Sequence, residues 1–420
     1  METWWCWLFV SVASLAAVVW AYINYAGFGK SLRYQLPQPP KPSEEDPRSL
    51  SGIATSHETE RDWPAAAIVS PGRDEAEHLP EVIPGWCEQD YPNLRVVFID
   101  DASTDDTPKI TAAMAERYPQ FMAVRNEQEP PAGWMGKCWA VHRGYGALDS
   151  EIRNQQSEIE WVCFTDADIH WHPQLLRTAI AHAEQHEADL VGVTPTLRFG
   201  SPGEAIVQLQ LVLALGLLLP FEKAMDPDSE VALTGGAFIL IRKKFYDAVG
   251  GHEAVKGEML EDLNLGKTIK AAGAKHVVAT AGELQWCRMY DGWADMWEGL
   301  TKNAYAGLGH RWWAAAGMLI ATALVNVGPV IYAVGSAMWL GLSPSVFPAV
   351  IFGVSLLTVA WQARALNAGR KLMKLPWPYA WTMPIGSAIY GVILAASVLQ
   401  YHTKGNAWKG RRYSSADAPA

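Results

Sequence analysis

Short apolar runs alternate with amphipathic stretches through the middle of the chain. Each run is bounded by Pro, Asp or Gly, and the runs lie at residues 65–69, 95–99, 161–165 and 189–194. Between them, residues 107–118 and 174–186 have the spacing of amphipathic helices. This alternation predicts an α/β domain at residues 65–285, with a mainly parallel sheet and helices on both faces. Ligands of such sheets bind outside the carboxyl ends of the strands.

The N-terminal end of the chain is apolar throughout. Residues 4–28 hold no Lys, Arg, Asp or Glu, and about 20 apolar residues suffice to cross a bilayer as a helix. No positive charge precedes this run, whereas Lys30 and Arg33 follow it, which favours a transmembrane anchor at residues 1–30 over a cleaved signal peptide. Because positive residues mark the cytoplasmic side, we expect the following domain to be cytoplasmic.

The C-terminal end predicts a transmembrane bundle at residues 312–402, followed by a basic cytoplasmic tail at residues 403–420. Its apolar runs lie at residues 313–342, 346–361 and 377–401. Three simple spans would place the basic tail on the opposite side from Lys30, against the tendency of positive residues to stay cytoplasmic. Either one segment is re-entrant or interfacial, or the first run forms a tight hairpin at Gly328-Pro329.

Two segments flank the α/β region and lack its alternation of apolar runs and amphipathic stretches. Residues 31–64 are rich in Pro, Ser and acidic residues, which predicts an extended or disordered linker. Residues 286–311 place Trp293, Met296 and Leu300 on one helical face, which predicts an interfacial amphipathic segment.

Another apolar stretch, at residues 204–222, interrupts the α/β region itself. It contains Gln208 and Gln210. At this length, and with two amides inside, a core or interfacial helix is favoured over a membrane span.

Composition removes several classes of protein. Half of the 420 residues are hydrophobic and the formal net charge is −10, which argues against a nucleic-acid partner because such proteins cluster Lys and Arg. The five cysteines form no CxxC pair. They therefore indicate neither a zinc site nor a disulfide framework, and they fit a reducing compartment.

The first chemical signal is a pair of carboxylates at a strand end. The apolar run at residues 95–99 leads directly into Asp100 and Asp101. A helix-capping turn explains residues 103–107 but not this pair. A carboxylate at the carboxyl end of a strand can accept hydrogen bonds from ribose hydroxyls or from a base N–H, so we interpret the pair as donor-binding.

The second signal is Asp166-x-Asp168, which again follows an apolar strand. Two carboxylate ligands beside a diphosphate suit Mg²⁺ or Mn²⁺, with phosphate oxygens and water completing the coordination shell. Such a metal neutralises charge on a leaving diphosphate. The sequence therefore predicts a metal site at this strand end, in the same crevice as Asp101.

Three further elements complete the candidate site. Glu261 and Asp262 open a predicted helix and are candidates for a general base, although acids also favour helix N-termini for electrostatic reasons alone. Lys137 follows a glycine-rich turn and is a candidate phosphate ligand. Gly235 and Gly236 form a tight small-residue turn that suits either the floor of an acceptor site or the entry to a strand.

In this order the elements resemble the inverting family 2 glycosyltransferases with a GT-A domain, from about residue 65 to residue 303. The order consists of Pro71-x-x-x-Glu75, Asp100-Asp101, Lys137, Asp166-x-Asp168, Gly235-Gly236 and Glu261-Asp262. The resemblance implies that Asp101 binds the uracil or ribose and that Asp168 holds the metal. It further implies that Asp262 is the base of a single displacement that inverts the anomeric carbon.

A later segment resembles the QxxRW signature of membrane-bound members of that family. It reads Gln285-Trp286-Cys287-Arg288-Met289. Arg288 is suited to contact the diphosphate. Met289 replaces the tryptophan that would stack an acceptor sugar, which weakens a polymerising role, and Trp286 and Trp293 are the candidates to take its place.

Nearly the whole chain is similar to the hopene-associated glycosyltransferases of hopanoid biosynthesis, with kinship to carotenoid-pathway enzymes. The likeness rests on Arg288-Met289-Tyr290, on residues 297–303 and on Trp408-Lys409-Gly410-Arg411. It implies a multi-pass enzyme of the cell inner (plasma) membrane. That enzyme moves a hexose from a nucleotide diphosphate sugar, expected to be UDP-linked, to a hydroxyl of a hopanoid or related isoprenoid lipid. The alternatives are a non-catalytic membrane scaffold and transfer to polyprenyl phosphate.

Overall fold

The computed structural model describes residues 2–26, 34–38, 62–155, 158–218, 220–404, 406–408 and 411–413. The chain forms two units. The described part of the first, called here the α/β unit, comprises Tyr34–Leu197 and Phe221–Arg288. The second, called the apolar unit, takes its described residues from Met1–Arg33, Arg198–Pro220 and Met289–Ala416.

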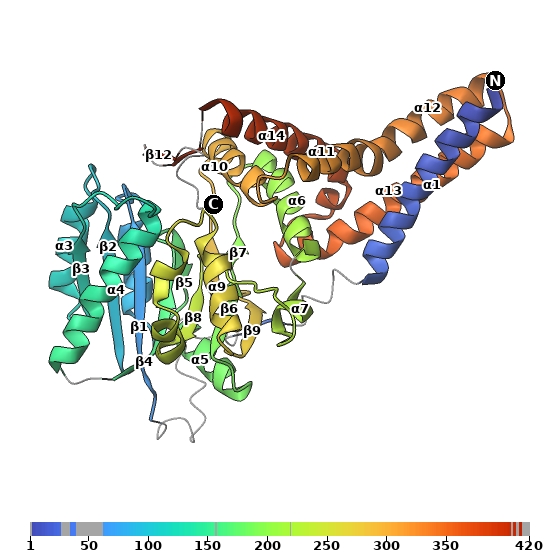
Figure 1. Cartoon of the computed structure of the whole chain (residues 1–420). Helices are drawn as coiled ribbons and strands as arrows, with labels where there is room; N and C mark the ends of the chain where they lie inside the picture. The colour runs from blue at the N-terminus through green and yellow to red at the C-terminus, as the bar shows by residue number, and fades with distance from the viewer. Residues whose placement is uncertain are drawn as a thin grey trace, which may run out of the picture. The chain divides into compact units, whose positions relative to one another are not determined.

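The α/β unit is built on a seven-stranded sheet in the order β3-β2-β1-β4-β8-β6-β9. Only β8 runs antiparallel to its neighbours, and the other pairs are parallel. The mainly parallel sheet predicted from the apolar runs is therefore confirmed (Figure 1). The strands are β1 (Ala65–Gly72), β2 (Leu94–Asp100), β3 (Phe121–Arg125), β4 (Ile159–Phe164), β6 (Leu190–Thr194), β8 (Ile239–Arg242) and β9 (His276–Thr280).

Helices connect these strands, and a small second sheet completes the unit. The second sheet has the order β5-β10-β7, formed by β5 (Ile169–Trp171), β7 (Thr196–Leu197) and β10 (Gln285–Cys287). The helices are α2 (Leu79–Cys87), α3 (Thr107–Arg117), α4 (Gly136–Gln155), α5 (Leu175–Gln185), α7 (Phe221–Met225), α8 (Lys243–Ala248), η2 (Gly251–Val255) and α9 (Glu261–Ala271). A mainly parallel sheet with this helical cover is the GT-A fold.

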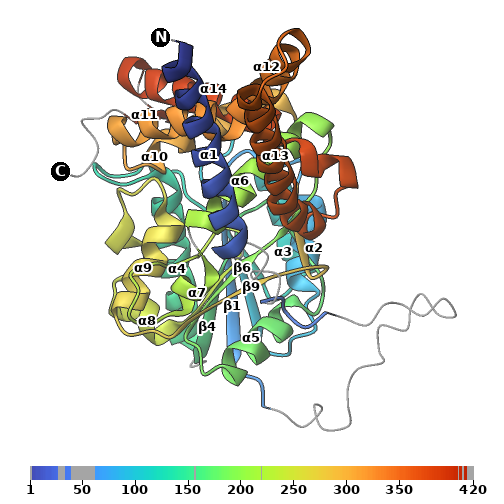
Figure 2. The same ribbon diagram turned by 90° about the vertical axis from the view of Figure 1, so that its right-hand side faces the viewer.

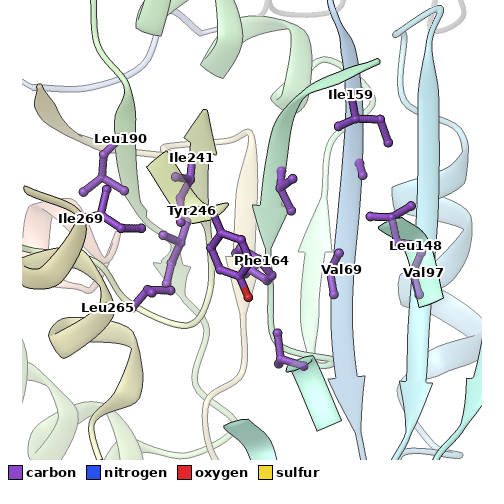
Figure 3. Packing of buried hydrophobic residues seen from close by; sticks show 14 of the residues in the cluster. Val69, Val97, Leu148, Ile159, Phe164, Leu190, Ile241, Tyr246, Leu265 and Ile269 are labelled. Atoms are coloured by element: carbon purple, nitrogen blue, oxygen red, sulfur yellow. The ribbon is translucent and has the colours of Figure 1, made fainter. Parts of the chain in front are cut away.

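One side of the large sheet buries a continuous apolar core. Alternate residues of β1 and β2, such as Val69 and Val97, point into it, and helices α4 and α9 contribute Leu148 and Leu265 (Figure 3). Tyr246 of α8 closes the layer beside Phe164 of β4, with ring centroids 4.8 Å apart. Burial of these side chains is the main driving force that holds the strand ends in fixed positions.

The first described residues of the α/β unit lie along its edge strand. Gln35 bridges to Thr280 of β9, and the Leu36 N–H donates to the Thr280 carbonyl at 3.0 Å. Leu36 is buried. This part of the linker predicted at residues 31–64 is thus extended and paired with the sheet, while Lys30, Arg33 and residues 39–61 lie outside the described residues.

The apolar unit is helical. Its described segments include four helices long and apolar enough to cross a membrane, at Trp7–Asn24, Trp312–Leu342, Val346–Leu372 and Met383–Thr403. Helix α13 (Val346–Leu372) runs beside both α1 (Glu2–Ala26) and α12 (Gly328–Leu342) (Figures 1 and 2). The predicted anchor and the predicted C-terminal apolar runs are therefore helices, and α13 extends 11 residues beyond the run expected to end at residue 361.

The hairpin considered at Gly328-Pro329 does not form. Helix α11 (Trp312–Ala321) passes through a π-helical segment, η3 (Thr322–Val327), directly into α12. Pro329 has no N–H and cannot complete a regular helical ladder, and a wider π turn accommodates such an interruption without reversing the chain. The run of residues 313–342 is one interrupted helix.

Helix α10 (Trp293–Ala306) differs from the expected surface helix. Met296 and Leu300, on its predicted interfacial face, are buried against α6 (Pro202–Leu218) and α14 (Met383–Lys404) of the same unit. Protein, rather than solvent, covers that part of the apolar stripe. The Trp293 side chain is half exposed, and its ring centroid lies 6.3 Å from that of Trp297.

The remaining elements of the apolar unit are short. The 3₁₀ helix η4 (Trp377–Trp381) precedes α14. Strands β11 (Asn406–Trp408) and β12 (Arg411–Tyr413) form an antiparallel hairpin in the tail predicted at residues 403–420.

In the α/β unit, Cys87, Cys138, Cys163 and Cys287 are buried free thiols. These four cysteines behave as small core residues.

Two glycines of α4 predict opposite effects on stability. A Cβ at Gly144 would overlap the buried Ile99 side chain, whereas a Cβ at Gly146 meets nothing within 4 Å. We expect Gly144→Ala to destabilise the α/β unit by about 1–3 kcal/mol through overpacking. Gly146→Ala should stabilise it by up to about 1 kcal/mol, because glycine is a poor helix former. Melting temperatures of the full-length protein in detergent test this pair, and equal shifts would contradict the packing described for α4.

Candidate active site

The carboxyl ends of β1, β2 and β4 carry the residues singled out in the sequence. β1 ends at Gly72, and the Asp101 N–H that follows β2 donates to the Gly72 carbonyl at 2.9 Å. β4 ends at Phe164, two residues before Asp166 and four before Asp168. Because these strands are parallel neighbours, their carboxyl ends lie at the same edge of the sheet.

The two aspartates at the end of β2 are held by residues at the end of β3 that the sequence did not identify. In the parallel register Asp100 pairs with Arg125, whose guanidinium donates to its carboxylate at 2.8 Å. The Ser103 N–H donates to the same side chain at 2.9 Å. Asn126 donates its side-chain amide to Asp101 Oδ1 at 3.0 Å. Asp100 thus has a structural partner of its own, and Asp101 is oriented by Asn126.

The loop after β1 is fastened to the loop after β2. The Asp74 N–H donates to Ser103 Oγ at 2.8 Å, and the Glu75 N–H donates to Thr107 Oγ1 at 2.9 Å. Asp74 has φ of 54°, a left-handed conformation that Asp tolerates better than most residues. Pro71 lies within β1, opposite Ile99 of β2. Pro71 and Glu75 of the family-like motif therefore share one end of the sheet with Asp101.

Lys137, at the start of α4, joins two other predicted site elements. Its ammonium lies 2.7 Å from Asp166 Oδ1 and 2.7 Å from Glu261 Oε1. The Lys137 side chain is 26% exposed and that of Glu261 is 11% exposed. Although burial opposes it, the carboxylates of Asp166 and Glu261 hold the pKa of Lys137 well above its usual value. Lys137 is therefore a permanent cation that links the β4 end to the start of α9.

Gly236 brings the remaining groups together. Its N–H donates to Asp262 Oδ2 at 2.8 Å, and its carbonyl accepts from the Asp166 N–H at 2.9 Å. The next carbonyl, that of Ala237, accepts from Thr165 Oγ1 at 2.8 Å and from Gln285 Nε2 at 2.9 Å. The buried glutamine of the QxxRW-like segment therefore fixes the turn on which the two aspartates converge. Gly235 is the exposed member of this turn.

The Asp262 carboxylate is held by hydrogen bonds, and its pKa is raised. Its Oδ1 accepts the Leu263 N–H at 2.8 Å, and its own carbonyl accepts from Thr234 Oγ1 at 2.7 Å. Burial, with a smaller contribution from Glu261, raises the pKa of Asp262 to about 7. A general base is most effective when its pKa lies near the working pH.

Asp168 also lies in an environment that disfavours a bare negative charge. Burial, then the carboxylates of Asp166 and Glu75, raise its pKa to about 7. A divalent cation would relieve this repulsion. Within the described residues, no group of three or more His, Cys, Asp or Glu side chains could hold a metal by itself. Asp166 and Asp168 offer carboxylate oxygens, so a metal held by them would take further oxygens from a bound substrate or from water.

The small sheet supplies an aromatic pair. Trp286 of β10 stacks on His170 of β5, with ring centroids 3.7 Å apart and planes at 4°. Arg288 follows β10 and is exposed. The other predicted acceptor residue, Trp293, belongs to the apolar unit, so the structure does not place it in this cluster. The stack was missed in the sequence because it depends on the register between β5 and β10.

Comparison with known proteins identifies the domain. Residues 67–250 match the family model of Glycosyl transferase family 2. The matched segment contains most of β1, Asp101, Lys137, Asp166-x-Asp168 and Gly236. These residues are therefore similar to the enzyme domain of family 2 glycosyltransferases, and the α/β unit that contains them has a GT-A fold.

Curated relatives share modest identity with the chain. It is 28% identical over 141 residues to the beta-monoglucosyldiacylglycerol synthase of Synechocystis sp., covering 33% of this chain and only 26% of that protein. It is 24% identical over 248 residues to the N-acetylglucosaminyl-diphospho-decaprenol L-rhamnosyltransferase of Mycobacterium tuberculosis, covering 53% of this chain and 78% of that protein.

A solved structure also aligns with most of the chain. It is a mannosyltransferase from Pyrobaculum calidifontis in complex with GDP-Man and Mn²⁺, 16% identical, with a TM-score of 0.46. The alignment covers 93% of this chain and 98% of the mannosyltransferase.

The Gly235-Gly236 turn predicts a sharp contrast between two conservative variants. A Cβ at Gly236 would overlap the Asp166 carboxylate and lie 3.0 Å from Lys137 Nζ, whereas a Cβ at Gly235 meets nothing within 4 Å. The Asp166 carboxylate can swing away at little cost in stability. We therefore expect Gly236→Ala to lower transferase turnover by about 100-fold, as misplacement by about 1 Å does in other sites, with a small change in melting temperature. Gly235→Ala should retain turnover, and equal activity of the two variants would contradict the geometry.

Proposed function

We propose that the chain is an inverting glycosyltransferase that moves a hexose from a nucleotide diphosphate sugar to a hydroxyl of a membrane lipid. The donor is UDP-linked, and the acceptor is a hopanoid or a related isoprenoid. Asp262 carries the proposal, because this half-buried carboxylate, whose pKa is raised, is held against the same turn as Asp166.

The reaction is a single displacement at the anomeric carbon. The acceptor oxygen forms a bond to that carbon while the bond to the diphosphate oxygen breaks, and Asp262 takes the hydroxyl proton. Asp101, oriented by Asn126, binds the base or ribose of the donor. Arg288 binds the diphosphate, where a planar guanidinium suits phosphate geometry. One displacement inverts the anomeric configuration.

Asp166 and Asp168 would hold Mg²⁺ or Mn²⁺. When bound, the metal stabilises negative charge on the departing diphosphate. The repulsion around Asp168 and the lack of a third protein ligand among the described residues both suit a metal that binds together with the donor. The GDP-Man and Mn²⁺ of the Pyrobaculum enzyme are the kind of pair that such a site takes.

A lipid acceptor is supported by the apolar unit and by the relatives. Four described helices are long and apolar enough to cross a membrane. We propose a multi-pass protein of the inner membrane with a cytoplasmic transferase domain. The Synechocystis relative is a glycosyldiacylglycerol synthase and the mycobacterial one acts on a diphospho-decaprenol. The hopanoid itself is supported by the sequence resemblance, and the Trp286–His170 stack offers an aromatic face for the acceptor side.

If Asp262 is the general base, replacing it should lower turnover and leave donor binding nearly unchanged. Asp262→Asn keeps the size of the side chain but removes the base. We expect turnover to fall at least about 100-fold, within the range that general base catalysis contributes, while the donor dissociation constant changes less than threefold. The exposed Asp228→Asn serves as the control. A matching loss of donor affinity in Asp262→Asn would remove Asp262 from the role of base.

Asp168 predicts the metal dependence of donor binding. In the unaltered protein, Mn²⁺ should tighten nucleoside diphosphate binding, measured by calorimetry on the full-length protein in detergent. Asp168→Ala removes one carboxylate ligand, so this enhancement should disappear. Binding that still depends on Mn²⁺ in Asp168→Ala would place the metal elsewhere.

A further inference from the structure

Lys137 contacts residues that have different tasks in the proposed reaction. Asp166, on one side, belongs to the metal pair, and Glu261, on the other, is the neighbour of the proposed base. The two carboxylates come from the end of β4 and the start of α9, which are separated by almost 100 residues of chain. A phosphate ligand alone would need neither contact.

The surroundings of Lys137 are arranged to admit its ammonium. A Cβ at Gly236 would lie 3.0 Å from Lys137 Nζ, so a side chain there would crowd the ammonium. Cys138, the next residue, is fully buried, and its thiol lies 3.5 Å from the Val255 carbonyl. The Met135 N–H donates to the Lys256 carbonyl at 2.6 Å. The turn before α4 is therefore fastened on both sides of Lys137, and its side chain is aimed by the backbone.

The ammonium and a divalent cation would serve the same carboxylate. Asp166 Oδ1 is 2.7 Å from Lys137 Nζ, a direct ion pair. The lysine therefore meets part of the need for positive charge among Asp166, Asp168, Glu261 and Asp262. A metal that binds Asp166 must compete with this contact.

Building on the proposed function, we propose that Lys137 is a positioning residue that acts as the fixed counter-cation of the site and competes with the metal for Asp166. When the metal and the donor diphosphate bind together, the metal takes the place of Lys137 at Asp166. The diphosphate then replaces the Asp166 carboxylate as the anion paired with Lys137. Lys137 keeps its contact with Glu261 throughout, so the start of α9 stays in place. Metal alone therefore binds weakly, and metal with nucleotide binds tightly.

The test is Mn²⁺ binding in the absence of nucleotide, measured by electron paramagnetic resonance on the full-length protein in detergent. Lys137→Met removes the charge but keeps an unbranched side chain. Two unit charges a few ångströms apart interact strongly near a protein surface, so we expect Mn²⁺ to bind at least about tenfold more tightly. Lys137→Arg keeps the charge and should retain an affinity near that of the unaltered protein.

Controls separate this effect from a general change in charge or folding. Lys109→Met removes an exposed lysine of α3 whose ammonium lies 2.6 Å from Asp106 Oδ1, and it should leave Mn²⁺ affinity unchanged. Glu261→Gln removes an anion and leaves Lys137 to Asp166, so it should weaken Mn²⁺ binding. Melting curves with and without Mn²⁺ check folding, and Mn²⁺ should raise the melting temperature of Lys137→Met more than that of the unaltered protein.

Each result has a definite meaning. Tighter Mn²⁺ binding in Lys137→Met together with weaker binding in Glu261→Gln supports the proposal. Unchanged or weaker Mn²⁺ binding in a folded Lys137→Met overturns it and leaves Lys137 as a phosphate ligand, with the proposed function intact. Asp168→Ala can be introduced into the unaltered protein and into the Lys137 and Glu261 variants. If it changes Mn²⁺ affinity in none of them, the metal part of the proposed function fails, and the counter-cation role fails with it.

Discussion

The active end of the α/β unit depends on one partly exposed cation. Asp166, Glu261 and Asp262 would repel one another if they were brought together without compensation, because partial burial reduces the screening by water. The ammonium of Lys137, 2.7 Å from two of these carboxylates, makes their approach possible. The glycine at position 236 leaves room for it. The other contacts of the site follow from this arrangement.

The sheet supplies the positions, and the loops supply the chemistry. Parallel neighbours β2, β1 and β4 place Asp101 and the Asp166-x-Asp168 pair at one edge, and α9 brings Asp262 to the same turn. Around this edge, many donors are backbone N–H groups, which cannot rotate away as side chains do. A preorganised site of this kind loses little free energy to rearrangement when charge develops in the reaction.

Much of this architecture could be predicted from local patterns. The apolar runs marked β1, β2, β4 and β6 to within a few residues, because buried strands need continuous apolar sequence. The partners Arg125 and Asn126 could not be found in this way. Their contact with Asp100 and Asp101 depends on the register between β2 and β3, which no local pattern reveals. The antiparallel direction of β8 could not be predicted for a related reason, since strand direction is set by tertiary pairing.

The apolar unit shows a second limit of pattern reasoning. An apolar stripe indicates burial but does not say whether lipid or protein covers it. In α10 the residues Met296 and Leu300 are covered by α6 and α14, so a stripe expected at a bilayer surface is part of a helical core. The Gly328-Pro329 pair likewise indicated an interruption of the helix. A π-helical segment accommodates this interruption, and the chain does not reverse its direction.

The most direct test of the account is donor cleavage by the purified full-length protein in detergent. A panel of nucleotide sugars is supplied with a hydroxylated hopanoid lipid extract, with and without Mn²⁺, and release of nucleoside diphosphate is measured. An inverting lipid glycosyltransferase should show metal-dependent release from one donor, increased by the lipid and accompanied by a glycolipid of inverted anomeric configuration. No release from any donor, with metal and lipid present, would contradict the account and favour a non-catalytic membrane scaffold.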